Sequence, residues 1–222
     1  MDDAARSSVK QTRDHLTIVY CHNYYQHRGG EDISFERDVK LLRERGHEVI
    51  PFIRDNRQLE SQSRISLATN TLWNRSIERQ FRSLLTEHQP DLVHANNLFP
   101  QISVSILATA KRQGIPVVQA LRNYRSFCAN AFLYRDGKVC TACMTSVLPW
   151  SAIRHRCYRG SVGASTVVAA MQVFHRLKKV QQRYVDAFIA PTEFARQVHV
   201  EGGFEADRVH VRSNFLDPDP GQ

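Results

Sequence analysis

The chain has 222 residues, a formal net charge of +8, 42% hydrophobic residues and 9% aromatic residues. This composition describes a globular chain that buries a sizeable core, and it excludes a disordered, collagen-like or coiled-coil protein. The first fifteen residues are polar, and the longest stretch without Asp, Glu, Lys or Arg, Leu92 to Ala110, is interrupted by polar residues. We therefore expect neither a secretory signal nor a membrane span, and the five cysteines then indicate the reducing cytoplasm.

The positive charge is concentrated in one third of the chain. Between Lys111 and Tyr184, thirteen Lys or Arg residues stand against one acid, Asp136, which gives this segment a formal charge of +12 and the remainder −4. Such a segment attracts anions, whether nucleic acids, phosphorylated sugars or acidic membrane surfaces. The charge alone leaves all three open.

Strand and helix patterns alternate along the chain, which predicts an α/β fold. The fold class we expect is a doubly wound parallel sheet (Rossmann-like) with a cysteine-bearing irregular insertion, residues 122–163, after the fourth strand. Short apolar runs predict six strands: Leu16–Tyr20, His47–Ile53, Asp91–Ala95, Val117–Leu121, Ala187–Ala190 and Val209–Val211. Helical periodicity predicts five helices: from about Glu31 to Gly46, Asn70 to Glu87, Ile102 to Arg112, Ser165 or Thr166 to Tyr184, and Thr192 to about Glu201.

The ends of the chain differ from its middle. Residues 1–15 form a polar tail, residues 16–216 form the predicted domain, and residues 217–222 (DPDPGQ) have the composition of a linker. A second domain is expected to follow such a linker.

Polar residues follow three of the predicted strands. They are Gly29, Gly30 and Glu31 after the first strand, Asn96 and Asn97 after the third, and Arg122, Asn123, Tyr124 and Arg125 after the fourth. Ligands of an open parallel sheet bind beyond the carboxyl ends of its strands, so the joint pattern predicts a ligand cleft. The two glycines before a helix suit the close approach of an anion, although a tight turn explains them equally well.

Several longer motifs carry a family resemblance. They are GGED (29–32), RGHEV (45–49), PDLVHANNLFPQIS (90–103), GIPVVQALRNYRSFCANAFLYRDGKVCTAC (114–143), YVDAFIAPTEFARQ (184–197) and GGFEADRVHVRSNFLDPD (202–219). With these motifs in this order, residues 16–220 resemble the N-terminal domain of family 4 glycosyltransferases, which have the GT-B architecture of two Rossmann-like domains.

The resemblance implies the acceptor-binding half of a retaining glycosyltransferase. Such an enzyme transfers a hexose from a nucleotide-diphosphate sugar to a glycan or lipid-linked acceptor, here in bacterial cell-surface polysaccharide synthesis. The nucleotide-sugar donor would be held mainly by a C-terminal domain, in the same chain or a separate one, that the 222 residues do not include. The chain alone is then expected to show little activity.

The resemblance also implies roles for individual residues. Gly29, Gly30 and Glu31 match the loop that approaches the donor phosphates and the acceptor, and Asn96 and Asn97 match the polar group after the third strand. Arg122, Asn123 and Tyr124 fall where many members carry His-Asp or His-Asn-Tyr. Because Arg122 replaces the histidine, the catalytic residue stays unassigned, and a permanently charged arginine suits a phosphate instead.

Four of the five cysteines, Cys128, Cys140, Cys143 and Cys157, follow the spacing C-x11-C-x2-C-x13-C. The central C-x2-C pair predicts a structural zinc with four thiolate ligands, in which His155 is an alternative to Cys157. Free thiols in a long loop, or an iron–sulfur or redox role, remain alternatives. Cys21, at the end of the first strand, is expected to be a small buried apolar residue.

Two further classes of binding partner remain open in addition to the sugar acceptor. The segment RLKKVQQR (176–183), with Arg154, Arg156 and Arg159, suits an anionic membrane surface, which would place the protein peripherally at the inner face of the membrane. The alternative function is a zinc-containing nucleic-acid-binding or interaction module. It accounts for the charge but leaves the GGE, HANN and RNY motifs unexplained, so nucleic acid is the less expected partner.

Overall fold

Six parallel strands form the central sheet of the computed structural model, which describes residues 14–57 and 64–216. The sheet order is β2-β1-β3-β4-β7-β8, and all five neighbouring pairs run parallel. The linker predicted at 217–222 and most of the polar tail lie outside the described residues. The strands are β1 (Thr17–Tyr24), β2 (Glu48–Asp55), β3 (Leu92–Ala95), β4 (Val117–Ala120), β7 (Ala187–Ala190) and β8 (Val209–Val211).

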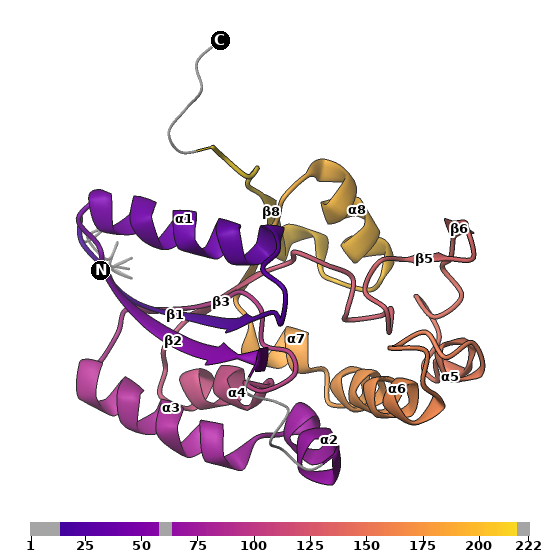
Figure 1. Ribbon diagram of the computed structural model, residues 1–222. Helices are drawn as coiled ribbons and strands as arrows, with labels where there is room; N and C mark the ends of the chain where they lie inside the picture. The colour runs from indigo at the N-terminus through magenta and orange to yellow at the C-terminus, as the bar shows by residue number, and fades with distance from the viewer. Residues whose placement is uncertain (1–13, 58–63, 217–222) are drawn as a thin grey trace, which may run out of the picture.

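Helices cover both faces of this sheet, as the doubly wound class requires (Figure 1). On one face lies α1 (Gly30–Glu44). Helix α8 (Glu193–Glu201) belongs to the opposite face, because its Ala195 packs in the same core cluster as Phe81 and Ile106. On that opposite face also lie α2 (Arg64–Leu72), α3 (Arg75–His88), α4 (Ser105–Arg112), α6 (Val162–Leu177) and α7 (Val180–Tyr184). The predicted Rossmann-like fold class is confirmed.

Strand β1 is buried on both sides because it lies inside the sheet. Successive side chains of a strand point to opposite faces. Val19 and Cys21 accordingly join the large core beneath α3 and α4, whereas Tyr20 packs with Phe35 and Val39 of α1. Cys21 is completely buried, as predicted, and burial raises the pKa of its thiol.

The chain reverses its direction of winding between β1 and β3. From β1 it first moves outward to β2, then returns to β3 on the other side and continues to β8. Loops at such a switch point lead away in opposite directions and leave a crevice at the carboxyl ends of the two strands. At this edge of the sheet the end of β3 contacts β1, because the Asn96 side-chain nitrogen lies 3.0 Å from His22 Nδ1.

The helix predicted from Asn70 to Glu87 is two helices, α2 and α3. Asn74 separates them, because its side-chain oxygen accepts a hydrogen bond from the Ile77 amide at 3.1 Å and caps α3. Its side-chain nitrogen donates to the Gln101 carbonyl at 2.7 Å. Asparagine favours the N-cap position over a helix interior, so this residue begins a helix where the periodicity alone predicted a continuous one.

The helix predicted from Ser165 or Thr166 to Tyr184 is also two helices, α6 and α7. Ser161 caps α6 by accepting a hydrogen bond from the Ala164 amide, and the left-handed Lys179 (φ +49°) separates α6 from α7. The apolar spacing of Ala170, Val173, Leu177, Val180 and Tyr184 predicts that these residues lie on the core side, but Ala170 and Leu177 are exposed. The buried side chains of α6 are Ser165, Val168, Ala169, Met171, Gln172 and His175.

The insertion after β4 is more ordered than predicted. It contains the antiparallel hairpin of β5 (Tyr134–Arg135) and β6 (Lys138–Val139), followed by the short helix α5 (Trp150–Arg154). Arg176 of α6 donates hydrogen bonds to the carbonyls of Cys143 and Met144 at 3.0 and 2.9 Å, which tie the insertion to the domain.

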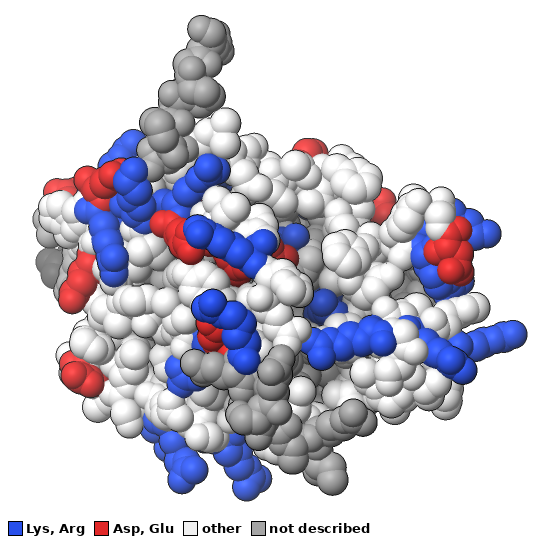
Figure 2. All heavy atoms as spheres, in the orientation of Figure 1, with Lys and Arg blue, Asp and Glu red and all other residues white. Residues whose placement is uncertain are grey.

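Lys and Arg side chains project from the part of the molecule formed by α5 and the insertion (Figure 2). This agrees with the charge distribution of the sequence, in which Asp136 is the one acid between Lys111 and Tyr184. Across the described ranges, 14–57 and 64–216, no helix combines the length and hydrophobicity that crossing a bilayer requires.

Candidate functional site

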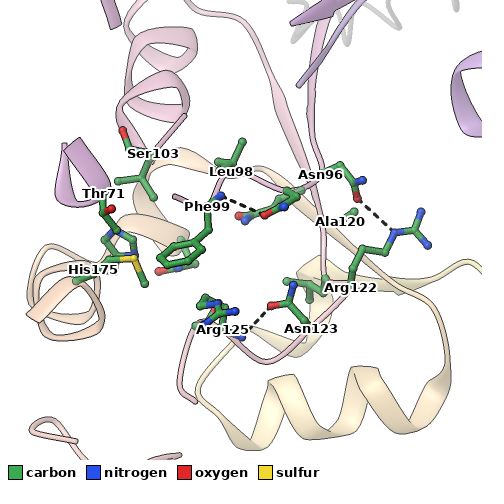
Figure 3. Close-up of a pocket in the computed structure, with 17 residues that line it drawn as sticks. Thr71, Asn96, Leu98, Phe99, Ser103, Ala120, Arg122, Asn123, Arg125 and His175 are labelled. Carbon is green, nitrogen blue, oxygen red and sulfur yellow. Dashed lines mark hydrogen bonds between the residues drawn. The ribbon is translucent and has the colours of Figure 1, made fainter. Parts of the chain in front are cut away.

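A cleft of about 90 Å³ lies at the carboxyl ends of β3 and β4 (Figure 3). Segments that follow these two strands line it, together with residues of α2, α6 and α7. Five of the residues selected from the sequence line this cleft: Asn96, Asn97, Arg122, Asn123 and Arg125. Polar side chains from the ends of β3 and β4 thus converge on one cavity, whereas the other selected residues do not line it: Gly29, Gly30, Glu31 and Tyr124.

A buried chain of hydrogen bonds holds Asn96 in place. His22, near the end of β1, is completely buried; its Nε2 lies 2.8 Å from the Asp32 carboxylate and its Nδ1 lies 3.0 Å from the Asn96 side-chain nitrogen. Both contacts are satisfied when Nε2 carries the proton, donates it to Asp32 and leaves Nδ1 to accept from Asn96. Burial lowers the pKa of His22, although the hydrogen bond with Asp32 opposes the shift. His22 thus orients Asn96 rather than facing a ligand.

Arg122 is held by a buried carboxylate. Its Nη2 donates to Asp38 at 3.0 Å, and its Nε donates to Asn96 at 3.4 Å. Asp38 also accepts hydrogen bonds from Arg212, at 2.7 and 2.8 Å, and from the Tyr20 hydroxyl at 2.9 Å. One carboxylate between two guanidinium groups leaves a net positive charge, which suits an anionic group beside the cleft.

Glu31, in the first turn of α1, reaches the loop after β4. Its carboxylate accepts hydrogen bonds from Asn123 at 2.8 Å and from the Tyr25 hydroxyl at 3.0 Å. Burial raises the pKa of Glu31, and the two donors oppose that shift by stabilising the carboxylate. The structure therefore joins two of the sequence-selected segments, the one after β1 and the one after β4.

Gly29 and Gly30 begin α1 without backbone strain. Gly29 is the N-cap residue with an extended backbone (φ −131°), and a Cβ atom added at either glycine would meet nothing within 4 Å. A tight turn is therefore not what requires glycine here. The carboxylates of Glu31 and Asp32 already complement the positive end of the helix, and Asp32 accepts a hydrogen bond from the Gly29 amide at 3.0 Å.

Two of the selected residues contribute to loop structure. The Asn97 side chain donates to the Asn23 carbonyl at 2.7 Å and accepts from the Phe99 amide at 3.1 Å, so it shapes the loop after β3. The Tyr124 ring packs against Phe127 and His199, with ring centroids 6.0 and 5.3 Å away.

Arg125 lies between aromatic rings. Its guanidinium carbon is 4.6 Å from the centre of the Phe99 ring and 5.2 Å from that of Tyr158. Burial lowers the pKa of Arg125. This stacking fixes both Arg125 and Phe99 at the cleft.

Sequence reasoning missed several residues that support the site. His22 was placed in a loop because β1 was predicted to end at Tyr20, whereas the strand continues to Tyr24. Arg212 directly follows the last strand, so the strand-end rule that selected Arg122 would also have found it. Nothing in the sequence pairs Asp38 of α1 with these arginines.

The four cysteines of the insertion, Cys128, Cys140, Cys143 and Cys157, line one small cavity of about 20 Å³ as free thiols. Burial raises the pKa of Cys143 and of Cys157, which disfavours the thiolate that binds metal. Among residues 14–57 and 64–216, no group of three or more His, Cys, Asp or Glu has an arrangement that holds a metal ion. The predicted zinc site is therefore not supported, either with Cys157 or with His155.

Residues 28–220 match the model of a protein family described as "Glycosyltransferase Family 4". The chain belongs to this family. A relative of this family 4 domain, an uncharacterized 42.6 kDa protein in the cps region of Klebsiella pneumoniae, is 25% identical over 133 residues, which cover 60% of the chain and 29% of the relative.

Solved structures share the fold of the family 4 domain. One is a UDP-N-acetylglucosamine 2-epimerase, which is 12% identical and has a TM-score of 0.50. The match covers 90% of the family 4 chain and 48% of the epimerase chain. Another is the UDP-GlcNAc 2-epimerase from Neisseria meningitidis, solved with UDP-GlcNAc bound, which is 14% identical and has a TM-score of 0.49. This match covers 89% of the family 4 chain and 46% of the epimerase chain. The family 4 domain thus spans less than half the length of each of these proteins.

Proposed function

We propose that the chain is the acceptor-binding half of a retaining glycosyltransferase that uses a nucleotide-diphosphate hexose. The observation that carries this proposal is the cleft at the carboxyl ends of β3 and β4, where Asn96, Asn123 and Arg122 converge in a member of family 4. Amide groups are suited to sugar hydroxyls, and an arginine with residual positive charge is suited to a phosphate.

Each side chain has a role in this proposal. Asn96 and Asn123 bind acceptor hydroxyls, and Glu31, held beside Asn123, accepts a hydrogen bond from the hydroxyl that attacks the sugar. The Arg122 and Arg212 pair stabilises the departing diphosphate from the acceptor side. Gly29 and Gly30 leave open space at the start of α1 for the reacting groups.

In this proposal, a second domain holds most of the nucleotide-sugar donor. That domain belongs to the same polypeptide or to a separate one. The coverage supports this proposal, because the chain spans 48% of the epimerase with the TM-score of 0.50 and 29% of the Klebsiella relative. Leaving-group stabilisation would then be shared between two domains. We expect no more than trace transfer by the 222 residues alone.

The biological setting we propose is cell-surface polysaccharide synthesis on a glycan or lipid-linked acceptor. The relative in a cps region supports this setting. The cationic segment from Lys111 to Tyr184 supports cytoplasmic placement at an anionic inner membrane surface, where lipid-linked acceptors are presented. Sedimentation with liposomes that rises with anionic lipid and falls with salt would support this placement, whereas binding indifferent to lipid charge would refute it.

The decisive assay measures sugar transfer from a panel of UDP- and GDP-hexoses to glycan acceptors. It compares the 222-residue chain alone with the chain combined with a donor-binding domain, which is supplied in the same or a separate polypeptide. Transfer with retained anomeric configuration by the combination supports the proposal. Absence of transfer there, together with a salt-dependent gel shift of nucleic acid, would favour the nucleic-acid-binding alternative.

A further inference from the structure

Two residues that line the cleft each have a buried side-chain atom without a hydrogen-bond partner. The two atoms are Oε1 of Gln119, on β4, and Nε2 of His175, on α6. His175 as a whole is only 8% exposed. Buried polar atoms are normally paired because leaving one unpaired costs free energy, so an unpaired atom in a residue that lines a cavity has the capacity to pair with a ligand.

Gln119 and His175 both line this cleft. Figure 3 shows His175 beside Thr71 at one end and Arg122 beside Asn96 at the other, with Phe99 between them. The four other unpaired buried side-chain atoms in the part of the chain that the structure describes belong to residues that do not line this cleft: Asn23, His94, Gln172 and His199. The unpaired atoms of Gln119 and His175 are thus the two, among the described residues, that belong to the lining of this cleft.

The end that holds His175 lacks charged side chains. The charged residues that line the cleft are Arg122 and Arg125; the former is bound to Asp38 and the latter is stacked on Phe99. An amide oxygen is an acceptor, so it repels a phosphate or carboxylate and attracts a hydroxyl donor. Burial also lowers the pKa of His175 to about 4, which keeps the imidazole uncharged at neutral pH.

We propose that Gln119 and His175 form a hydroxyl-recognition subsite for a neutral sugar ring. A hydroxyl of the sugar donates to Gln119 Oε1, and the same or a neighbouring hydroxyl pairs with His175 Nε2, which satisfies both unpaired atoms. This proposal deepens the proposed function and rests on it, because the sugar would be part of the acceptor. The subsite selects for a hydroxyl at one ring position, since an analogue without it would leave both atoms unpaired.

The test uses NMR on the 222-residue chain labelled with ¹³C at the histidine rings. The probes are the methyl glycosides of glucose, galactose, mannose and N-acetylglucosamine, with the deoxy analogues of whichever one binds. We expect saturable shifts of the His175 resonance with one of these glycosides, and at least a tenfold higher Kd for one of its deoxy analogues. This arm needs no variant and so does not depend on folding.

Variants provide the second arm. His175→Leu and Gln119→Leu should each raise the Kd of that glycoside about tenfold, whereas Gln182→Leu, the same change at an exposed position of α7, should leave it unchanged. The subsite would be overturned by a glycoside that binds both cleft variants with the Kd of the unaltered chain and does not shift the His175 resonance. That result would still agree with the proposed acceptor cleft. Inorganic phosphate that shifts His175 in competition with the glycoside would overturn the assignment to a neutral ligand. If no glycoside binds, both proposals fail.

Discussion

Arg122 and Asp38 form a buried ion pair at 3.0 Å, with side chains only 6% and 3% exposed. The pair connects the loop after β4 to the middle of α1. Arg212 approaches the same carboxylate from the end of β8, so one acidic residue joins three elements that are far apart in the sequence. Arg122 is thereby fixed in position.

Asp38→Asn should destabilise the protein strongly. The change leaves two guanidinium groups without their carboxylate, and removal of one partner from a buried pair costs about 3 to 5 kcal/mol. Urea unfolding of the variant should show this loss in the free energy of unfolding. Asp207→Asn, the same change at an exposed position, is the control and should have almost no effect. Equal stability of the two variants would show that the ion pair contributes little.

Gly30→Ala should fold normally, because an added Cβ meets nothing within 4 Å and the backbone is not left-handed. We expect a change of less than about 0.5 kcal/mol in the free energy of unfolding. Gly46→Ala is the contrast. Its φ is +84° and its Cβ would lie 2.6 Å from the His15 ring, so it should lose about 1 kcal/mol or more. A large loss for Gly30→Ala would mean that structure, rather than ligand approach, requires that glycine.

Acid should destabilise the protein partly through His175. Its pKa is lowered from 6.5 to about 4 by burial, so the unfolded chain binds more protons than the folded one between these values. Stability is then fully present above pH 6.5 and falls as the pH drops through this window, by about 2 kcal/mol between pH 7 and pH 4.5 for this one group.

The matched variants for this pH effect are His175→Gln and His210→Gln. Urea unfolding of His175→Gln should lose about 2 kcal/mol less than the unaltered chain between pH 7 and pH 4.5. His210 is exposed, so its replacement should leave the pH dependence as it was. The same acid sensitivity in all three proteins would exclude His175 as a source.

The five cysteines should separate into two classes of reactivity. Cys21 is completely buried, and the four cysteines of the insertion are half-buried free thiols. A thiol reagent should therefore modify four thiols in the folded chain and the fifth only after unfolding. Protection of all four insertion thiols that ends when a chelator is added would instead reveal a bound metal and restore the zinc prediction.

Much of the fold follows from local patterns. β7 and β8 were predicted at their observed bounds. Each is a short apolar run next to a clear helix signal, so the sequence allows few other positions for the ends of the strand. The two broken helices were missed for a physical reason. Apolar periodicity continues across a break, and only the capping preference of Asn74 and the left-handed backbone of Lys179 mark the interruptions.

The cleft could be predicted in part. Asn96 and Asn123 were found because the carboxyl ends of parallel strands meet at one edge of the sheet. Asp38 and His175 lie on helices whose distance from that edge is set by packing, so no local pattern identifies them. The structure is also needed to see that Asn97 and Tyr124 contribute to loop packing.

The most direct test of the central claim is the rate of sugar transfer from the nucleotide-sugar panel by the purified 222-residue chain. If the chain is the acceptor-binding half of a glycosyltransferase, it should give no more than trace product alone, whereas the chain combined with a donor-binding domain should transfer the hexose with retention. Robust turnover by the 222 residues alone would contradict the division of donor and acceptor binding between two domains.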